Sequence, residues 1–255
     1  MSEKKFEKDM GKTTLKGLNQ DYLHVDPLKE AYVESLFEAP TFEQSIQLNK
    51  VALMVIDMQF LDAAPGCGVF ADVQKSGVPI EAQEYYFKRL DHVVLPNIGR
   101  LQNLFRDLKL EVIHTRIQSL TKDGRDRSTG HKRLGLHAPP GSKEADFLPE
   151  VAPKGDEIVI NKTASGVFNA TNAEFILRNI GIDSLYICGV YTNECVSTTV
   201  RDACDRGFHT TLIADGCATV TPDLQNATIA TIKDRYARVL TTEEVIKEIK
   251  ASVNK

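Results

Sequence analysis

From residue 51 onward, the chain alternates between short apolar runs and longer segments in which apolar residues recur at helical spacing. A continuous apolar run is typical of a strand covered on both faces, whereas apolar residues three and four positions apart predict a helix. On this basis we predict six strands, at residues 51–56, 111–115, 157–161, 185–190, 209–214 and 237–240. We predict helices at residues 84–108, 173–180, 194–206 and 224–234, and a last helix that starts at residues 241–244.

This alternation predicts the α/β class, with a mostly parallel six-stranded sheet between layers of helices and right-handed crossovers. Pro96 marks a kink or a boundary inside the first helix, and Gly207 follows the end of the third. A threonine is placed to cap the last helix. A chain of 255 residues is long enough for one sizeable core, so we expect one domain over residues 49–255.

The first 48 residues differ from the rest because they show little strand periodicity. Residues 28–37 have the pattern of one short helix. We interpret residues 1–48 as an N-terminal arm that packs over the domain or onto a neighbouring subunit. A frayed tail is the alternative.

Composition and charge narrow the possible partners. The chain is 42% hydrophobic and 26% charged, as soluble globular proteins are. Its net charge of -4 and pI near 5.9 argue against nucleic acid as the main partner. No apolar stretch approaches the roughly 20 residues of a membrane span, and residues 2–9 are too polar for a secretion signal. Five cysteines in no disulfide-framework spacing predict free thiols and a cytoplasmic location.

Three residues with chemical potential follow predicted strands, at the end where open α/β sheets gather their reactive groups. Asp57 follows the first strand, Lys162 the third, and Cys195 the fourth. Cys195 lies in the first turn of a helix, where the macrodipole favours the nucleophilic thiolate over the thiol. Each residue taken alone has an alternative interpretation. Asp57 would cap a turn, Lys162 would be a solvated surface cation, and Cys195 would be a small core residue. An acid, a cation and a nucleophile at equivalent ends favour one joint site.

Three segments carry a resemblance to a known family: Val55-Ile56-Asp57-Met58-Gln59, Lys162-Thr163-Ala164-Ser165-Gly166-Val167-Phe168 and Gly189-Val190-Tyr191-Thr192-Asn193-Glu194-Cys195-Val196. Over roughly residues 51–242 the chain resembles the isochorismatase-like cysteine hydrolases. The resemblance implies a three-layer, Rossmann-like α/β/α sandwich and a catalytic triad of Asp57, Lys162 and Cys195. It also implies a cis peptide between Val190 and Tyr191, and an oxyanion hole made by the amides of Tyr191 and Cys195.

The triad implies a covalent mechanism without a redox cofactor. Asp57 takes the thiol proton while Lys162 holds Asp57 in place, and the Cys195 thiolate attacks a carbonyl carbon. Each backbone donor of the oxyanion hole contributes about 3 kcal/mol in the transition state. Asp57 then protonates the departing nitrogen, and water hydrolyses the thioester.

The cysteine also selects a branch within the resemblance. Members that act on the vinyl ether of isochorismate lack a cysteine nucleophile at this position, so hydrolysis of a carbon–nitrogen bond is favoured. The nicotinamidase branch carries an Asp-x-His-x-His type metal site, but residues 59–86 contain no histidine and His114 stands alone. We therefore expect no metal and no other cofactor. The remaining branch acts on carbamoyl and ureido compounds, such as ureidoacrylate, biuret or triuret, and N-carbamoyl amino acids.

Six residues are predicted to bind the substrate, and two further arginines of the same loop are candidates. Gln59 lies two positions beyond Asp57 and matches the family motif, while Phe60, Phe168 and Tyr191 are expected to form apolar walls. Arg116 and Gln118, with Arg125 and Arg127 of the same polar loop, are placed to bind carboxylate or urea oxygens. The alternative for these residues is a solvated charged loop. His131 and His137 are expected to anchor the loop.

Two other functions stay open at this point. One is a vinyl-ether hydrolase of the isochorismatase type, and the other is a binding module that keeps the catalytic residues unused. We expect a small-molecule amide or ureide as the substrate, and neither nucleic acid nor membrane as a partner. By analogy with the family, we expect a homodimer or a homotetramer.

Overall fold

The computed structural model describes residues 46–72, 76–169 and 171–253. All of them lie in the second of two compact units, Ser45–Lys255. The arm predicted for residues 1–48, with its short helix, lies outside the described residues except for its last three. No helix in the described segments has both the length and the apolar character to cross a membrane.

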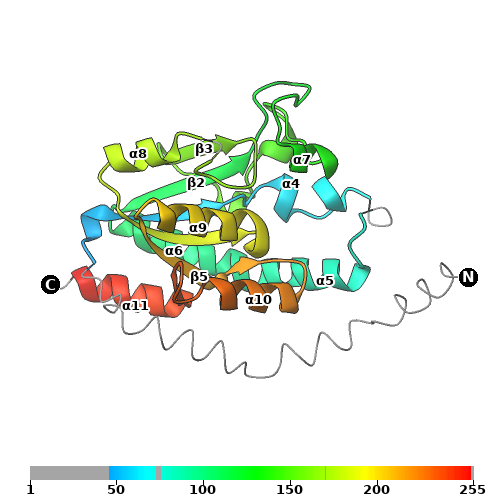
Figure 1. Cartoon of the computed structure of the whole chain (residues 1–255). Helices are drawn as coiled ribbons and strands as arrows, with labels where there is room; N and C mark the ends of the chain where they lie inside the picture. The colour runs from blue at the N-terminus through cyan, green and yellow to red at the C-terminus, as the bar shows by residue number, and fades with distance from the viewer. Residues whose placement is uncertain (1–45, 73–75, 170, 254–255) are drawn as a thin grey trace, which may run out of the picture. The chain divides into compact units, whose positions relative to one another are not determined.

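A six-stranded parallel sheet forms the centre of this unit (Figure 1). Its strands are β1 (Val51–Ile56), β2 (Glu111–Ile117), β3 (Ile158–Lys162), β4 (Ser184–Val190), β5 (His209–Ala218) and β6 (Arg238–Leu240). They lie in the order β3-β2-β1-β4-β5-β6. The chain therefore builds one half of the sheet outward from β1 to β3, and the other half from β4 to β6. The connections reverse direction between β1 and β4, and ligands bind at such a switch point in open α/β sheets.

Helices cover both faces of the sheet, which confirms the predicted α/β/α sandwich. Figure 1 shows α9 (Ser197–Asp205) in front of the sheet and α6 (Leu95–Asp107) behind it. Ion pairs and hydrogen bonds join neighbouring helices within each layer. Arg100 pairs with Glu243 between α6 and α11 (Thr242–Val253), at 2.6 Å. Arg206, at the end of α9, pairs with Glu174 of α8 (Ala173–Asn179). Arg201 of α9 donates to the Thr231 hydroxyl of α10 (Pro222–Ile232).

The two central strands approach closely where the site lies. Every residue of β1 and β4 is buried. Gly189, near the end of β4, has a backbone φ of +118°, and a Cβ added there would lie 2.1 Å from the Ile56 carbonyl oxygen. Glycine is therefore required at this position by both its conformation and its neighbour.

All six predicted strands are present, and the differences have local causes. β5 extends to Ala218 although Asp215-Gly216 has the signature of a turn. Its pairing with β4 shifts register between Ile187 and Gly189, which accommodates the extra residues. The predicted helix at 84–108 starts earlier, as α5 (Ile80–Arg89), and passes through a π-type segment, Leu90–Val94, into α6. Pro96 lies in the first turn of α6, the boundary that the sequence indicated.

Candidate active site

Asp57 is the first residue after β1, and its backbone conformation is unusual. Its φ is +52°, in the left-handed region that aspartate tolerates better than most residues. The Asp57 amide donates to the Thr115 carbonyl at 3.1 Å, and the Thr115 hydroxyl donates to Asp57 Oδ1 at 3.0 Å. The residue is fully buried. β1 and β2 together therefore fix the direction of this carboxylate.

Lys162 is the last residue of β3, and its side chain is completely buried. Its Nζ lies 2.7 Å from Asp57 Oδ2, which makes a buried ion pair at hydrogen-bonding distance. It also donates to the Ala164 carbonyl at 3.1 Å and to Cys195 Sγ at 3.4 Å. Burial lowers the pKa of Lys162, but the negative charges of Asp57 and Cys195 outweigh burial and hold the pKa above its ordinary value. An ammonium group has three N–H donors, so all of them are engaged here.

Cys195 lies in a π-type segment, Thr192–Val196, between β4 and α9. Its side chain is 4% exposed. Burial raises the pKa of the thiol well above its ordinary value. The charge of Lys162 opposes this effect, while Asp57 and Asp62 add to it. The resting residue is therefore a thiol. Desolvation and two nearby carboxyl groups thus oppose the preference for thiolate that a helix macrodipole gives.

Tyr191 forms one side of the site, and the peptide bond between Val190 and Tyr191 is cis, as the resemblance implied. The Tyr191 ring stacks on that of Tyr86 with centroids 5.0 Å apart, and its hydroxyl donates to the Asp62 carbonyl at 2.9 Å. The Tyr191 carbonyl accepts hydrogen bonds from the amides of Glu194 and Val196. The oxyanion hole of the Tyr191 and Cys195 amides stays a prediction.

The Gln59 side chain is bonded to backbone groups at both ends of its amide, which the sequence did not predict. Its amide nitrogen donates to the carbonyls of Ile117 at 3.0 Å and Glu144 at 2.8 Å. Its amide oxygen accepts from the Ile117 amide at 2.6 Å. Both N–H donors are used and the side chain is fully buried. Gln59 therefore joins β1, β2 and the segment around residue 144, and leaves no donor for a substrate.

Arg116 points away from the triad. Neighbouring side chains of a strand leave on opposite faces, and Thr115 is the one that contacts Asp57. The Arg116 guanidinium donates to Asn161 Oδ1 at 2.8 Å and to the Ala145 carbonyl at 2.9 Å, and lies over the Phe147 ring. These contacts hold Arg116 against Asn161 and the segment around residue 145, and its predicted role in substrate binding stays a prediction.

Phe168 also lies away from the thiol. Its ring packs on Phe208 with centroids 5.5 Å apart, and the Arg206 guanidinium lies over it. Arg206 and Phe208 follow the end of α9, whereas Cys195 precedes its start. The nine residues of α9 span about 13 Å. The Phe168 ring therefore packs toward the far end of α9, while the amide of Val167 donates to Thr199 in the first turn, and the predicted wall stays a prediction.

The predicted roles of Phe60 and Gln118 in substrate binding stay predictions. Phe60 is partly buried in α4 (Phe60–Ala63), and Lys143 Nζ lies 4.8 Å from its ring centroid. Gln118 is partly buried, and its backbone amide donates to the Lys162 carbonyl at 3.0 Å.

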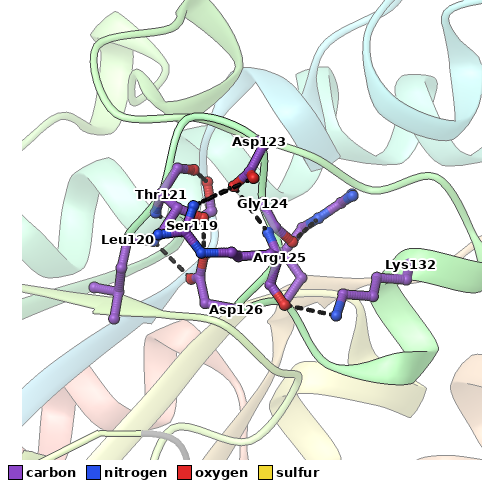
Figure 2. A network of polar contacts seen from close by, with 9 residues as sticks. Ser119, Leu120, Thr121, Asp123, Gly124, Arg125, Asp126 and Lys132 are labelled. Carbon is purple, nitrogen blue, oxygen red and sulfur yellow. Dashed lines mark hydrogen bonds and ion pairs between the residues drawn. The ribbon is translucent and has the colours of Figure 1, made fainter.

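The polar loop after β2 is held together by its own side chains (Figure 2). The Asp126 carboxylate accepts hydrogen bonds from the amides of Leu120 and Thr121 and from the Thr121 hydroxyl. The exposed Arg125 pairs with Asp123 at 3.1 Å. For Arg125, this arrangement corresponds to the alternative of a solvated charged loop.

His131 is buried beside the site, in α7 (Thr129–Arg133). Its backbone amide donates to the Ser128 hydroxyl at 3.2 Å, which caps this helix. Burial and then the charge of Lys162 lower the pKa of His131 to about 4. The ring is therefore neutral near pH 7.

One functional candidate was missed by the sequence analysis. Asp62 is 2% exposed in α4 and lies within electrostatic reach of Asp57 and Lys162. Nothing in the local pattern distinguishes it, because its burial comes from Tyr86 and Tyr191, which are distant in sequence. Within the described residues, no group of three or more His, Cys, Asp or Glu side chains is arranged to hold a metal ion.

Comparison with known proteins places this site in context. The chain is similar to the isochorismatase family protein YwoC of Bacillus subtilis, with 29% identity over 185 residues, 71% of this chain and 93% of that protein. It is similar to N-carbamoylsarcosine amidase of an Arthrobacter species, with 26% identity over 62% of each chain. It is also similar to maleamate amidohydrolase of Pseudomonas putida, with 25% identity over 79% of this chain and 88% of that protein.

Solved structures share the fold of this chain. A solved cysteine hydrolase structure from Pseudomonas syringae matches 84% of this chain and 98% of its own, with a TM-score of 0.67 and 22% identity. Residues 51–244 match the family model of the isochorismatase domain. Because this match spans most of the chain, the protein belongs to the isochorismatase family of hydrolases.

Proposed function

We propose that the protein is a cysteine hydrolase that cleaves a carbon–nitrogen bond of a small linear amide, of the carbamoyl or ureido class. The observation that carries this proposal is the contact of Lys162 Nζ with both Asp57 and Cys195, at 2.7 and 3.4 Å. The names of two relatives, N-carbamoylsarcosine amidase and maleamate amidohydrolase, support amide cleavage.

The first half of the reaction forms a thioester. Asp57 accepts the proton of the Cys195 thiol, and Lys162 stabilises the thiolate that results. The sulfur attacks the carbonyl carbon, a C–S bond forms, and the carbonyl electron pair moves to oxygen. The amides of Tyr191 and Cys195 donate to this oxyanion. Asp57 then gives its proton to the nitrogen as the C–N bond breaks, which releases ammonia or an amine.

The second half restores the enzyme. Asp57 removes a proton from water, and the oxygen attacks the thioester carbon. The C–S bond breaks, the sulfur takes the proton back, and the acid product leaves. For a ureide this acid is a carbamic acid. The raised pKa of the Cys195 thiol, due to its burial, supports a cycle that begins and ends with a protonated sulfur.

Ammonia release from a substrate panel tests the proposal. The panel holds biuret, triuret, ureidoacrylate, N-carbamoylglycine and maleamate. Isochorismate, the vinyl-ether alternative, contains no nitrogen and is followed separately by its disappearance. We expect activity on at least one amide or ureide and its loss in Cys195→Ala. Cys204→Ala is the matched control, because Cys204 lies in the same helical segment but outside the triad.

The outcomes separate the alternatives. Turnover of isochorismate that survives Cys195→Ala would identify a vinyl-ether hydrolase. No turnover of any amide or ureide would contradict the proposal and favour a binding module.

A further inference from the structure

Asp62 is held firmly by its main chain while its carboxyl group stays unsatisfied. Its backbone carbonyl accepts hydrogen bonds from the hydroxyls of Tyr86 at 2.8 Å and Tyr191 at 2.9 Å. The two tyrosine rings stack on each other. The side chain is buried, yet Oδ2 has no hydrogen-bond partner among the described residues. A buried polar atom without a partner in a well-anchored residue calls for an explanation, and a partner supplied by a bound molecule is one.

This carboxyl group belongs to the surroundings of the triad. After burial and the charges of Lys162 and Asp57, Asp62 is the next influence on the pKa of the Cys195 thiol, and it also acts on Lys162. Lys162 cannot satisfy Asp62 by a hydrogen bond, because its three donors are held by Asp57, Ala164 and Cys195. Asp62 is tied to Tyr191, four residues before Cys195, and its Oδ2 has no hydrogen-bond partner among the described residues.

Burial favours the neutral form of this carboxyl group. A buried carboxylate without a counterion is strongly disfavoured relative to the protonated acid. Burial, and then the negative charge of Asp57, raise the pKa of Asp62 well above its ordinary value. A carboxylic acid offers one O–H donor and one carbonyl acceptor on the same edge. That edge is complementary to an amide or ureide, which presents a carbonyl oxygen and an N–H side by side.

We propose that Asp62 is a substrate-binding residue whose carboxyl group pairs with a second carbonyl and the adjacent N–H of an uncharged ureide. This inference rests on the function proposed above. The scissile carbonyl is taken by Cys195 and the oxyanion donors, so the pair with Asp62 is made by another carbonyl of the same substrate. Biuret has such an arrangement, whereas N-carbamoylglycine carries a carboxylate.

A substrate carboxylate is disfavoured next to Asp62 for two reasons. It brings a further anion beside the buried Asp57 carboxylate. It also finds the ammonium of Lys162 fully engaged. Asp62 therefore determines specificity for uncharged ureides over carboxylate-bearing ones.

Two variants test this role. Asp62→Asn keeps a donor and an acceptor on one edge but has no proton to lose, and Asp62→Ala removes both. We expect Asp62→Ala to raise the KM for biuret by about ten- to a hundredfold. Its KM for N-carbamoylglycine rises less than threefold, so the preference for biuret falls. An equal change for the two substrates would overturn the inference.

The pH dependence of the KM for biuret distinguishes a binding role of Asp62 from a merely structural one. In the wild type, the KM for biuret rises with pH once Asp62 ionises, by about tenfold per unit. In Asp62→Asn, the KM is several-fold higher at pH 6 but stays flat up to pH 9. The titratable groups that act on Asp62 or contact it are Asp57, Lys162, Glu194, Cys195, Tyr86 and Tyr191.

Glu194 is the group to exclude, since burial also raises its pKa. Glu194→Gln therefore serves as the control, and it must retain the rise of KM with pH. A rise that disappears in Glu194→Gln and persists in Asp62→Asn would overturn the role of Asp62.

Urea unfolding separates this inference from the proposed function. A group whose pKa is raised by folding stabilises the native state at low pH, and that stability is lost as the pH rises. Asp62→Asn is thus expected to gain stability relative to the wild type between pH 5 and pH 8. If the gain appears but no ureide is hydrolysed, the proposed function fails and the binding role falls with it, while the neutral carboxyl stands. If ureides are hydrolysed but Asp62→Asn gains no stability and Asp62→Ala keeps the preference for biuret, only the inference fails.

Discussion

Replacement of Lys162 by methionine removes a cation that three buried groups share. Methionine preserves most of the apolar stem, so the loss is one of charge and hydrogen bonding. Breaking a buried pair by removing one partner costs about 3–5 kcal/mol, because the other charge is left uncompensated. The Ala164 carbonyl loses a hydrogen bond worth about 1 kcal/mol. We therefore expect Lys162→Met to lower the free energy of unfolding by about 4–6 kcal/mol.

A double variant isolates the contribution of the charge. In Asp57→Asn with Lys162→Met, the asparagine oxygen still accepts the Thr115 hydroxyl and no buried charge remains. The double variant should therefore be more stable than Lys162→Met alone, by about 2–3 kcal/mol. This result would be unusual, since a second substitution in a core normally adds to the damage.

Urea unfolding at pH 7, followed by far-UV circular dichroism, measures both differences at a common m-value. Lys247→Met, at an exposed position in α11, should change stability by less than about 0.5 kcal/mol. Equal losses in the single and double variants would refute the argument, because the loss would then come from packing and not from an uncompensated carboxylate. A loss below about 1 kcal/mol in Lys162→Met would refute the burial of the pair itself.

Three further predictions concern the thiol, the half-buried carboxylate of Glu157 and the central glycine. Because burial raises the pKa of Cys195, its alkylation by iodoacetamide should rise about tenfold per pH unit from pH 6 to 9, measured by peptide mass spectrometry; a plateau near pH 7 would indicate a resting thiolate. Burial raises the pKa of Glu157, but hydrogen bonds from Arg106 lower it to about 2. The stability it confers is present above pH 4.5 and lost as the pH falls toward 2, so Glu157→Gln should cost about 2–3 kcal/mol in urea at pH 7 and much less at pH 3; a constant cost would refute this. Gly189→Ala should cost about 3 kcal/mol or more in thermal unfolding, because the methyl group meets the Ile56 carbonyl. Gly99→Ala, which meets nothing within 4 Å, is its control, and equal effects would contradict the close approach of β1 and β4.

The sequence predicted the elements whose signal is local. β1 and β4 are buried on both faces, so their apolar runs identify them and their ends directly. From the strand ends alone, Asp57, Lys162 and Cys195 could be placed at one edge of the sheet. The resemblance then supplied their roles and the cis peptide. These parts depend on positions along the chain and not on how distant side chains meet.

The parts that sequence reasoning missed depend on distant contacts. Asp62 is enclosed by tyrosines 24 and 129 residues away, and no local pattern encodes this. Phe168 turns toward Phe208, and Arg116 toward Phe147, because of packing that only the folded chain defines. The resting state of Cys195 depends on a balance between a macrodipole and burial, and the sequence shows only the first.

The hydrogen bonds of Gln59 have a consequence for how this protein can change over time. They fasten residue 144 to β1 and β2, and the amide of Leu148 donates to the Met58 carbonyl close by, at 2.9 Å. The long excursion between β2 and β3 is thus secured at its base, while residues 120–142 lie beyond the fastening. Substitutions at exposed positions of that outer part, such as Arg125, leave the hydrogen bonds of Gln59 in place. The base of this excursion can therefore stay fixed while its exposed outer residues vary.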